Sequence, residues 1–424
     1  MFRFLHAADI HLDSPLRGLD RYDGAPVEEV RRASRSALEN LVACALEEGV
    51  QFVLIAGDLY DGDWRDYNTG LCFVKQMSRL RDAGIPVYLV AGNHDAANKM
   101  TRALRLPANP AGDDPMLSPR RPETRRLDDL GVAIHGRSFA TAAETANLAV
   151  EYPPADRGMF NIGLLHTSLE GDAEHATYAP CSLADLAARE YQYWALGHIH
   201  KRRQVGADPL VVYPGNVQGR HIRESGEKGC CLVAVSDSHE VSVQFRPLDV
   251  FRWELCRVNC RDAADGDDVL DRFGRRLREL LGLHAPLPLG IRVALDGPCP
   301  AHQRLAADQE AFAAQIRATA IEVSSGRAWV EKVEIGTSYP TSTDAALAAD
   351  GPGQELSACL DELLADRSRL EALAGELDSL KKKLPAELLE GPDALACDDP
   401  AWLAAMLGQV RPLLLQRLAA RENA

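Results

Sequence analysis

The sequence predicts a layered α/β fold for residues 1–249, followed by a smaller α/β unit and a helical C-terminal segment. Three observations support this prediction. Short apolar runs alternate with amphipathic stretches of helical period, several runs end in glycine, and the alternation stops at a segment rich in proline, glycine and small residues. We expect a first domain at 1–249, a small α/β domain at 250–340, a linker at 341–355 and helices at 356–424.

Eight apolar runs are the expected strands of the first domain: 2–5, 52–56, 87–91, 162–165, 193–196, 210–213, 230–235 and 241–245. Helices are expected between several of them, at 27–47 and at 67–83, where Gly84 closes the second. The small domain repeats this pattern. Its expected strands are 253–260, 289–295 and 329–335, and its expected helices are 267–281 and 302–318.

The C-terminal segment carries an amphipathic leucine stripe. Between positions 356 and 384, residues at alternating spacings of four and three are mostly leucine. A second helix is expected at 401–418. One interpretation is an αα-hairpin that folds onto its own domain. The other is a docking surface for a partner helix or coiled coil.

The composition is that of a globular protein with ample core: of 424 residues, 46% are hydrophobic and 26% are charged. No apolar segment approaches the length of a membrane span, and the N-terminus reads as a strand rather than a signal peptide, so we expect a cytoplasmic protein with no membrane contact. Ten cysteines without a CxxC pair indicate neither a disulfide framework nor a zinc cluster. A net charge of −15 argues against broad attraction to nucleic acid but permits a local site.

Polar side chains follow five of the expected strands, in the stretches ADIH, GDLYD, GNHD, LLHTS and GHIH. They are Asp9, His11, Asp58, Asp61, Asn93, His94, Asp95, His166, His198 and His200. Ligands of open α/β sheets usually bind at the carboxyl ends of strands. Carboxylate, imidazole and amide oxygen suit divalent metal ions, so the sequence predicts a metal centre here.

A pair of ions is the preferred interpretation, because two metals about 3.5–4 Å apart need one bridging carboxylate with terminal ligands on either side. Asp58 suits the bridge. Period-two alternation in extended backbone is expected to place Asp9 beside His11, and His198 beside His200. Mn²⁺ is the preferred ion for such ligands, with Mg, Fe or Zn as alternatives.

The motifs DIHLD, GDLYDGDW, GNHD, LLHTS, GHIH and YPGN resemble those of the calcineurin-like metallophosphoesterase superfamily, in particular its DNA repair exonuclease branch of SbcD-like and YhaO-like proteins. The resemblance implies a four-layer β-sandwich flanked by helices. It implies that Asp9, His11, Asp58 and His200 bind the first metal. It implies that Asp58, Asn93, His166 and His198 bind the second.

The same resemblance makes His94 the candidate general acid or stabiliser of transition-state charge, while Asp95 would orient His94 or hold the turn. Related nucleases often carry a histidine shortly after the GD aspartate, where this chain has Asp61. Asp61 is therefore either a residue near the centre, with tentative substrate contact, or a turn former.

Further basic and polar residues have two interpretations each. In YPGNVQGRHIRE, the residues Asn216, Arg220 and His221 are candidates for substrate or metal-site contacts, with a structural turn as the alternative. Lys201, Arg202 and Arg203 could follow a phosphate backbone. The basic stretch 119–126 is expected to be a solvated loop, and His6 and His135 are expected to be structural.

The leading functional hypothesis is a dinuclear-metal-dependent DNA exonuclease that hydrolyses phosphodiester bonds with a metal-activated hydroxide. One alternative is a phosphodiesterase of small substrates such as cyclic nucleotides. The other is a weakly active scaffold that binds DNA or organises an ATPase. The resemblance also implies an SMC-like or Rad-type ATPase partner (YhaN-like), bound through the C-terminal helices, and homodimerisation.

Overall fold

The computed structural model describes residues 1–14, 16, 26–61, 67–97, 106–169, 177–340, 352–384, 395–397 and 399–422. The chain forms two compact units. The first contains Met1–Leu255 with the segments Leu280–Arg292 and Ser324–Glu331, and the second contains the remaining residues from Cys256 onward.

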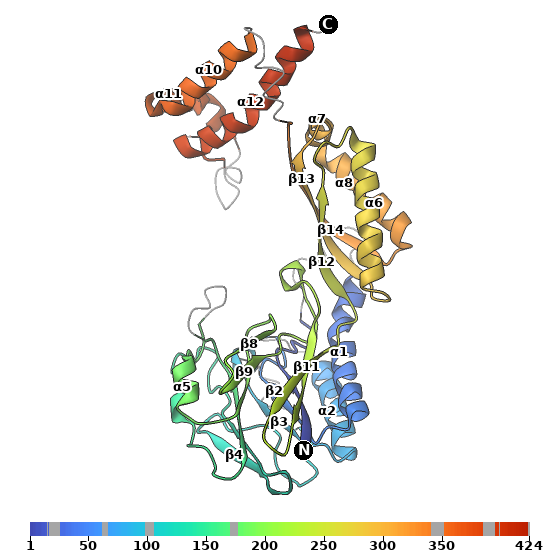
Figure 1. Ribbon diagram of the computed structural model, residues 1–424, viewed down its shortest axis with the longest axis vertical. Coiled ribbons are helices and arrows are strands. Elements are labelled where there is room, and N and C mark those ends of the chain that lie inside the picture. Colours follow the sequence, from blue (N-terminus) through green and yellow to red (C-terminus); the bar gives the residue numbers. More distant parts are fainter. Residues whose placement is uncertain are drawn as a thin grey trace. The chain divides into compact units, whose positions relative to one another are not determined.

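Two β-sheets build the first unit (Figure 1). The five-stranded sheet has the order β11-β10-β1-β2-β3, in which β1, β2 and β3 are parallel. Its strands are β1 (Phe2–Ala7), β2 (Phe52–Ala56), β3 (Val87–Val90), β10 (Gly229–Val235) and β11 (Val241–Pro247). The six-stranded sheet has the order β4-β5-β6-β7-β9-β8. Its strands are β4 (Glu123–Leu127), β5 (Val132–Gly136), β6 (Phe160–His166), β7 (Tyr193–Gly197), β8 (Arg203–Val205) and β9 (Leu210–Tyr213).

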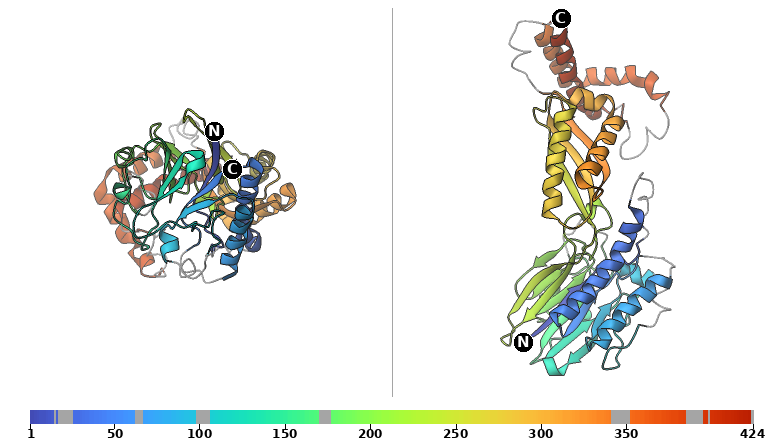
Figure 2. Two further views of the ribbon diagram at one scale, coloured as in Figure 1. Left: turned by 90° about the horizontal axis from the view of Figure 1, so that it is seen from below. Right: turned by 90° about the vertical axis from the view of Figure 1, so that its right-hand side faces the viewer.

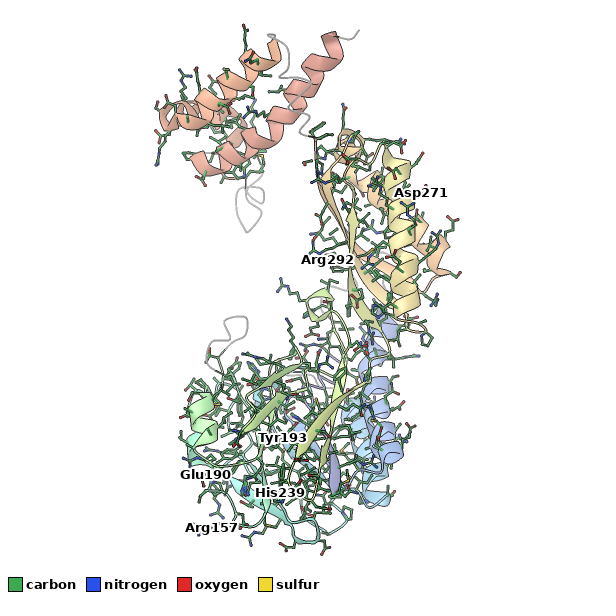
Figure 3. The ribbon with its side chains drawn as sticks, viewed as in Figure 1. Arg157, Glu190, Tyr193, His239, Asp271 and Arg292 are labelled. Atoms are coloured by element: carbon green, nitrogen blue, oxygen red, sulfur yellow. The ribbon has the colours of Figure 1, made fainter. Side chains whose placement is uncertain are left out.

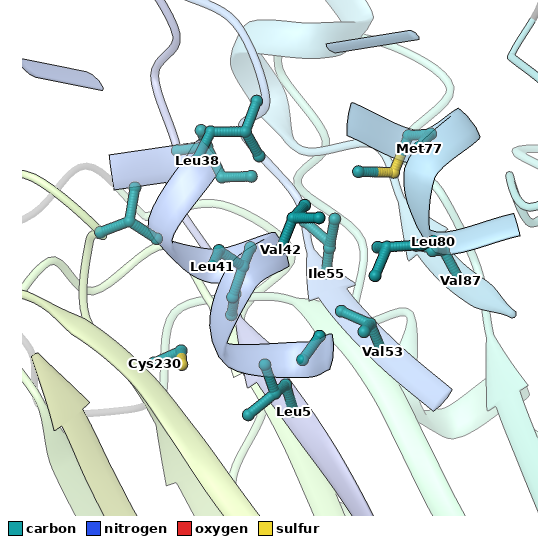
Figure 4. Close-up of a cluster of buried hydrophobic side chains, with 14 of the residues drawn as sticks. Leu5, Leu38, Leu41, Val42, Val53, Ile55, Met77, Leu80, Val87 and Cys230 are labelled. Atoms are coloured by element: carbon teal, nitrogen blue, oxygen red, sulfur yellow. The ribbon is translucent and has the colours of Figure 1, made fainter. Parts of the chain in front are cut away.

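The two faces of the five-stranded sheet bury different layers, as the period-two alternation of strands requires. On one face, Leu5 and Ile55 pack with Leu41 of α1 (Val27–Glu48) and Met77 of α2 (Tyr67–Asp82) (Figure 4). The two helices contact each other along this face (Figure 2). Burial of such side chains contributes roughly 1.5–3 kcal/mol each to folding.

The opposite face packs against the six-stranded sheet and forms the inner layer of a sandwich. Phe4 stacks on Phe52 with ring centroids 4.8 Å apart, and Phe4 meets Tyr193 of the facing sheet edge-on. A third apolar cluster, which includes Trp194 and Leu186 of α5 (Leu183–Ala187), covers the outer face of the six-stranded sheet. The predicted sandwich flanked by helices is therefore confirmed.

Three strands of the six-stranded sheet, β4, β5 and β8, were not predicted from the sequence. The basic stretch 119–126 was expected to be a loop, but β4 begins within it at Glu123, and its side chains alternate between half-buried and exposed. β4 and β8 are the two edges of their sheet, where charged side chains remain in solvent and no apolar run develops. β5 is short and fully buried, but its sequence VAIHG contains a histidine that interrupts the apolar pattern.

A three-stranded sheet has the order β12-β13-β14, formed by β12 (Arg252–Asn259), β13 (Leu289–Pro298) and β14 (Ala328–Ser338). Helix α6 (Gly266–Leu283) connects the first two strands. The single helix expected at 302–318 is two helices, α7 (His302–Ala307) and α8 (Gln309–Ser324), because Asp308 adopts a non-helical conformation between them.

The described residues that follow include the helices α10 (Pro352–Ala365), α11 (Arg367–Lys381) and α12 (Pro400–Glu422), and each contacts the other two. The leucine stripe is interrupted at Asp366, which separates α10 from α11 and whose side chain accepts from Ser368. Leu360 and Leu370 of the stripe are buried, so part of it packs inside this group of helices. The predicted domain boundaries remain predictions, and residues 341–351 of the predicted linker lie outside the described residues.

No helix in the described part of the chain combines the length and the apolar composition needed to cross a bilayer.

His6 gives a testable pH dependence of stability. Its ring is fully buried between the sheets, where Nδ1 lies 3.0 Å from the hydroxyl of Tyr193, labelled in Figure 3. Burial lowers the pKa of His6 from 6.5 to about 3. The unfolded chain therefore binds this proton first, so the stabilisation present above pH 6.5 is lost as the pH falls toward 3.

Between pH 7 and pH 5, wild type should lose about 2 kcal/mol more unfolding free energy than His6→Gln, which has no imidazole to protonate. Denaturant unfolding at the two pH values measures this difference. Equal losses in both proteins would contradict the prediction.

Candidate metal centre

The loops that follow β1 and β2 lie side by side and form the floor of the candidate site. Backbone N–H groups of Asp9, His11 and Leu12 donate to the carbonyls of Gly57, Asp58 and Leu59 at 3.0, 3.0 and 2.8 Å. The loop after β6 is joined to β7 by Thr167, which donates to the carbonyl of Gly197. All of these segments lie at the carboxyl ends of parallel strands, as predicted.

The backbone at the site is left-handed rather than extended. Asp9, His11, Asp58 and His198 have φ values of 52°, 44°, 52° and 106°. Period-two alternation therefore does not explain how Asp9 meets His11, and that argument was wrong because β1 ends at Ala7 and β7 at Gly197. Such conformations cost about 1–3 kcal/mol each and persist where the surrounding structure fixes them, typically at functional sites.

Three groups of side chains bring their ligand atoms within 4.8 Å of one another. They are Asp9 with His11 and His200, His11 with Asp58 and His94, and Asp9 with Asp58 and His166. Asp9, His11 and Asp58 each belong to two of these groups, and Asp58 is the carboxylate that His11 and His166 share. Asp58 Oδ2 lies 3.9 Å from His11 Nε2 and 3.4 Å from His166 Nε2, which suits a bridging carboxylate.

The distances within the cluster fit shared metal ions. His11 Nε2 lies 3.2 Å from His200 Nε2, and Asp58 Oδ2 lies 3.4 Å from His166 Nε2. Two ligand atoms that are each about 2.1 Å from one ion lie roughly 3.0–3.4 Å apart. The residues present can therefore hold divalent ions, although the ligand assignments remain predictions.

Electrostatics also favours a cation here. Burial raises the pKa of Asp9 well above its usual range, and the neighbouring carboxylate of Asp58 raises it further. Burial lowers the pKa of His11 to about 3 and also lowers that of His200. These two imidazoles are thus neutral at pH 7, the form that binds metals.

The side chains predicted for the second metal also lie close together. His166 is fully buried, with Nδ1 2.9 Å from the carbonyl of Ala56 and Nε2 3.1 Å from Asn93 Oδ1. The backbone N–H of His198 donates to Asp9, and its ring centroid lies 5.2 Å from that of His166. The structure therefore gathers all seven predicted ligands around Asp9 and Asp58.

His94 is the second residue of the short helix α3 (Asn93–Ala97), beside the cluster. Its backbone N–H donates to Asp58 Oδ1 at 3.0 Å, and its Nδ1 lies 2.9 Å from Asp61 Oδ1. Burial alone would lower the pKa of His94, but the hydrogen bond to Asp61 and the charge of Asp58 outweigh it and raise the pKa. Asp61, predicted as a tentative substrate contact or turn former, is thus the residue that orients His94.

Asp95 does not orient His94. Its buried carboxylate accepts backbone N–H groups of Leu59, Tyr60 and Gly92 at 2.9, 3.1 and 3.0 Å. These bonds join the loop after β2 to the start of α3, so the geometry favours the turn-holding alternative over a catalytic role.

The segment after β9 contributes three predicted residues and one that the sequence analysis missed. Asn216 is fully buried and donates to Glu224 at 2.9 Å, which argues against the predicted substrate contact. Arg220 lies beside His200 and Asp61, and the half-exposed His221 lies farther out. The missed residue is Glu224, a buried carboxylate 2.8 Å from His200 Nδ1. Nothing in its local sequence, RHIRES, distinguishes it from a solvated glutamate.

The structural expectation for the remaining two histidines agrees with their contacts. His135 is buried, with its ring nitrogens 2.8 Å from Thr124 Oγ1 and 3.0 Å from Asn161 Oδ1. His6 pairs with Tyr193, as described above.

Gly92 gives a test of the centre that substitutes none of the candidate ligand residues. A Cβ atom at this position would lie 2.3 Å from Asp58 Oδ1 and 2.9 Å from His166 Cε1. Gly92→Ala should therefore displace the carboxylate and weaken Mn²⁺ binding about 10- to 100-fold, as changes around ligands typically do. Calorimetric titration of metal-stripped protein measures this.

The matched control is Gly282→Ala in α6, where an added Cβ would meet no atom within 4 Å. The control should bind Mn²⁺ like wild type. Unchanged binding by Gly92→Ala would show that Asp58 is not a ligand.

Comparisons with known proteins agree with this geometry. Residues 2–202 match the family model of the calcineurin-like phosphoesterases, and residues 253–338 match the middle domain of metallophosphoesterase YhaO. The chain is 34% identical over 301 residues to "Uncharacterized metallophosphoesterase YhaO" of Bacillus subtilis (strain 168), which covers 70% of this chain and 72% of that protein.

Relatives from archaea share a lower identity. The chain is 28% identical over 298 residues to "DNA double-strand break repair protein Mre11" of Aeropyrum pernix, covering 66% of this chain and 68% of that protein. It is 27% identical over 292 residues to the protein of the same name from Haloferax volcanii, covering 66% and 58%. The chain therefore belongs to the calcineurin-like metallophosphoesterases, within the YhaO-like family.

Proposed function

We propose that this protein is a dinuclear-metal-dependent phosphodiesterase that acts on DNA as an exonuclease. The observation that carries the proposal is that buried Asp58 belongs to one group of potential ligands with His11 and His94 and to another with Asp9 and His166. Two divalent ions bound there would supply an activated water and neutralise charge on a phosphodiester.

The chain's own residues have distinct parts in this reaction. Asp9, His11, Asp58 and His200 would hold one ion, and Asp58, Asn93, His166 and His198 would hold the other. His94 is about one-third exposed and would donate a proton to the departing sugar oxygen or stabilise charge on the phosphate. Asp61 fixes the ring by contacting Nδ1, so Nε2 is the nitrogen that faces the substrate.

Two observations favour DNA over a small diester. Lys201, Arg202 and Arg203 directly follow His200 and are exposed, so they can contact the phosphates of a longer strand. Several relatives carry the name DNA double-strand break repair protein.

The activity is tested with metal-stripped protein reloaded with Mn²⁺, on end-labelled single- and double-stranded DNA and on bis-p-nitrophenyl phosphate. Asp58→Asn and His94→Gln should each lower the rate on every substrate by at least about 100-fold, because they remove the bridge and the candidate acid. The controls Asp129→Asn and His239→Gln change exposed residues and should act like wild type.

Substrate class is tested separately with Lys201→Gln/Arg203→Gln, paired with the exposed control Arg120→Gln/Arg121→Gln. The first pair should slow DNA cleavage and weaken its salt dependence while the small diester is hydrolysed normally. Cleavage of only the small diester by wild type would favour the small-substrate alternative. Failure on all substrates with two ions bound would favour the scaffold alternative.

An ATPase partner of the SMC-like or Rad-type class remains part of the proposal, with the C-terminal helices as its binding element and the chain as a homodimer. Because Leu360 and Leu370 are buried among α10, α11 and α12, such a partner would contact the outer surface of these helices rather than the whole leucine stripe.

Deletion of residues 352–424 should abolish co-purification of the ATPase while Mn²⁺ binding by the truncated protein stays unchanged, because every candidate ligand lies before residue 201. Pull-down from the native host with both proteins tests this. Retention of the ATPase by the truncated chain would contradict this binding site.

A further inference from the structure

Glu224 is a buried carboxylate that the reaction outlined above does not use. Glu224 lies in the short helix η4 (Ile222–Glu224) and is 5% exposed. Oε1 lies 2.8 Å from His200 Nδ1 and 2.7 Å from Arg220 Nη2, while Oε2 accepts from Asn216 Nδ2 at 2.9 Å and from the backbone N–H of Arg220 at 2.8 Å. Both oxygens of this carboxylate are thus surrounded by donors.

The contacts of His200 present a choice between two tautomers. Its Nε2 faces the candidate metal centre, 3.2 Å from His11 Nε2 and 3.9 Å from Asp9 Oδ1. A neutral imidazole binds a metal through the nitrogen that carries no proton, so Nδ1 must carry it here. With the proton on Nε2 instead, His200 could not be a ligand.

Arg220 and Glu224 favour opposite tautomers. Arg220 Nη2 lies 3.1 Å from Nδ1, and a guanidinium can only donate, so this contact alone would favour a bare Nδ1 and a proton on Nε2. A carboxylate accepts, so Glu224 favours the proton on Nδ1. With Glu224 present, Nδ1 and Nη2 both donate to the same oxygen, and their 3.1 Å separation follows from that shared acceptor.

The contacts of Glu224 leave its oxygens as acceptors. Besides the donors named above, Arg220 Nε lies 3.2 Å from Oε1 and 3.3 Å from Oε2. A carboxylate surrounded by donors in this way presents an acceptor to His200 Nδ1.

We propose that Glu224 is a positioning residue that holds His200 in the tautomer able to bind metal, against the opposite preference of Arg220. This inference rests on the proposed function only in taking His200 as a metal ligand. The guanidinium of Arg220 also lies 3.7 Å from Asp61 Oδ2, next to His94. Glu224 thus allows Arg220 to stay at the site while His200 keeps the tautomer that binds metal.

A double-mutant cycle separates this role from simple charge. Glu224→Ala should weaken Mn²⁺ binding to metal-stripped protein about 10- to 100-fold, in the range found for residues that orient ligands. Arg220→Ala should have a larger effect on Mn²⁺ affinity in the Glu224→Ala background than in wild type, by a factor of at least about five. In the Glu224→Ala background it should restore affinity, because there Arg220 is the donor that favours the wrong tautomer of His200 and Glu224 no longer opposes it. Calorimetry measures affinity and stoichiometry for all four proteins.

If Arg220 acts only through its charge, Arg220→Ala should change Mn²⁺ affinity by the same factor in wild type and in Glu224→Ala, and that result would overturn the proposal. A Glu224→Ala protein that binds Mn²⁺ as tightly as wild type would overturn it too. Glu227→Ala is the control, since Glu227 lies in the same loop with its side chain half exposed and 3.6 Å from Arg252. If Glu224→Ala fails to fold, Glu224→Gln keeps the side-chain volume and should show a smaller loss in the same direction.

A direct readout needs neither metal nor activity. In metal-free wild type, ¹⁵N spectra of the histidine rings should show the His200 proton on Nδ1, and in Glu224→Ala they should show it on Nε2. A proton on Nδ1 in both proteins would overturn the proposal. If the tautomers are as expected but the wild-type protein does not hydrolyse DNA, the proposed function is contradicted and the role of Glu224 is not.

Discussion

The structure of the site depends on two buried carboxylates, Asp9 and Asp58, that lie within 4.8 Å of each other. Like charges at this distance inside a protein repel strongly, and burial adds the cost of removing each from water. The surroundings offer imidazoles and backbone N–H groups, while the guanidinium of Arg220 contacts Asp61 and Glu224. Cations bound between the carboxylates would relieve this repulsion, and the left-handed loops and the sandwich core hold the carboxylates in place for them.

The fold and most of the site are predictable from sequence where a strand is buried on both faces. β2 and β9 have the predicted bounds, because a strand buried on both faces produces a continuous apolar run between polar ends. Polar residues stand out after such buried runs, as Asp58 does after β2 and His94 does after β3. The edge strands β4 and β8 give no such signal, since one side of each remains in solvent.

Relations between distant loops are what the sequence does not reveal. Asp61 meets His94, and Glu224 meets His200, across 33 and 24 positions of sequence. Each meeting depends on how two strand-end loops approach in space, which neither periodicity nor residue type encodes. The same limit explains the error for Asp9 and His11: the alternation rule was applied to backbone that had already left the strand.

The carboxylates of the site also determine the charge that a substrate meets. Asp58, Asp61 and Glu224 lie close together among the described residues, so without metal their cluster disfavours an anionic phosphodiester. Two divalent ions would reverse the sign of this local charge and make the same place attractive to phosphate. Substrate binding and metal binding are then linked through charge as well as through chemistry, because loading the centre makes it more attractive to a phosphodiester. Glu224 contributes to both properties: its negative charge adds to the repulsion, and its hydrogen bond keeps His200 able to bind the ion that cancels it.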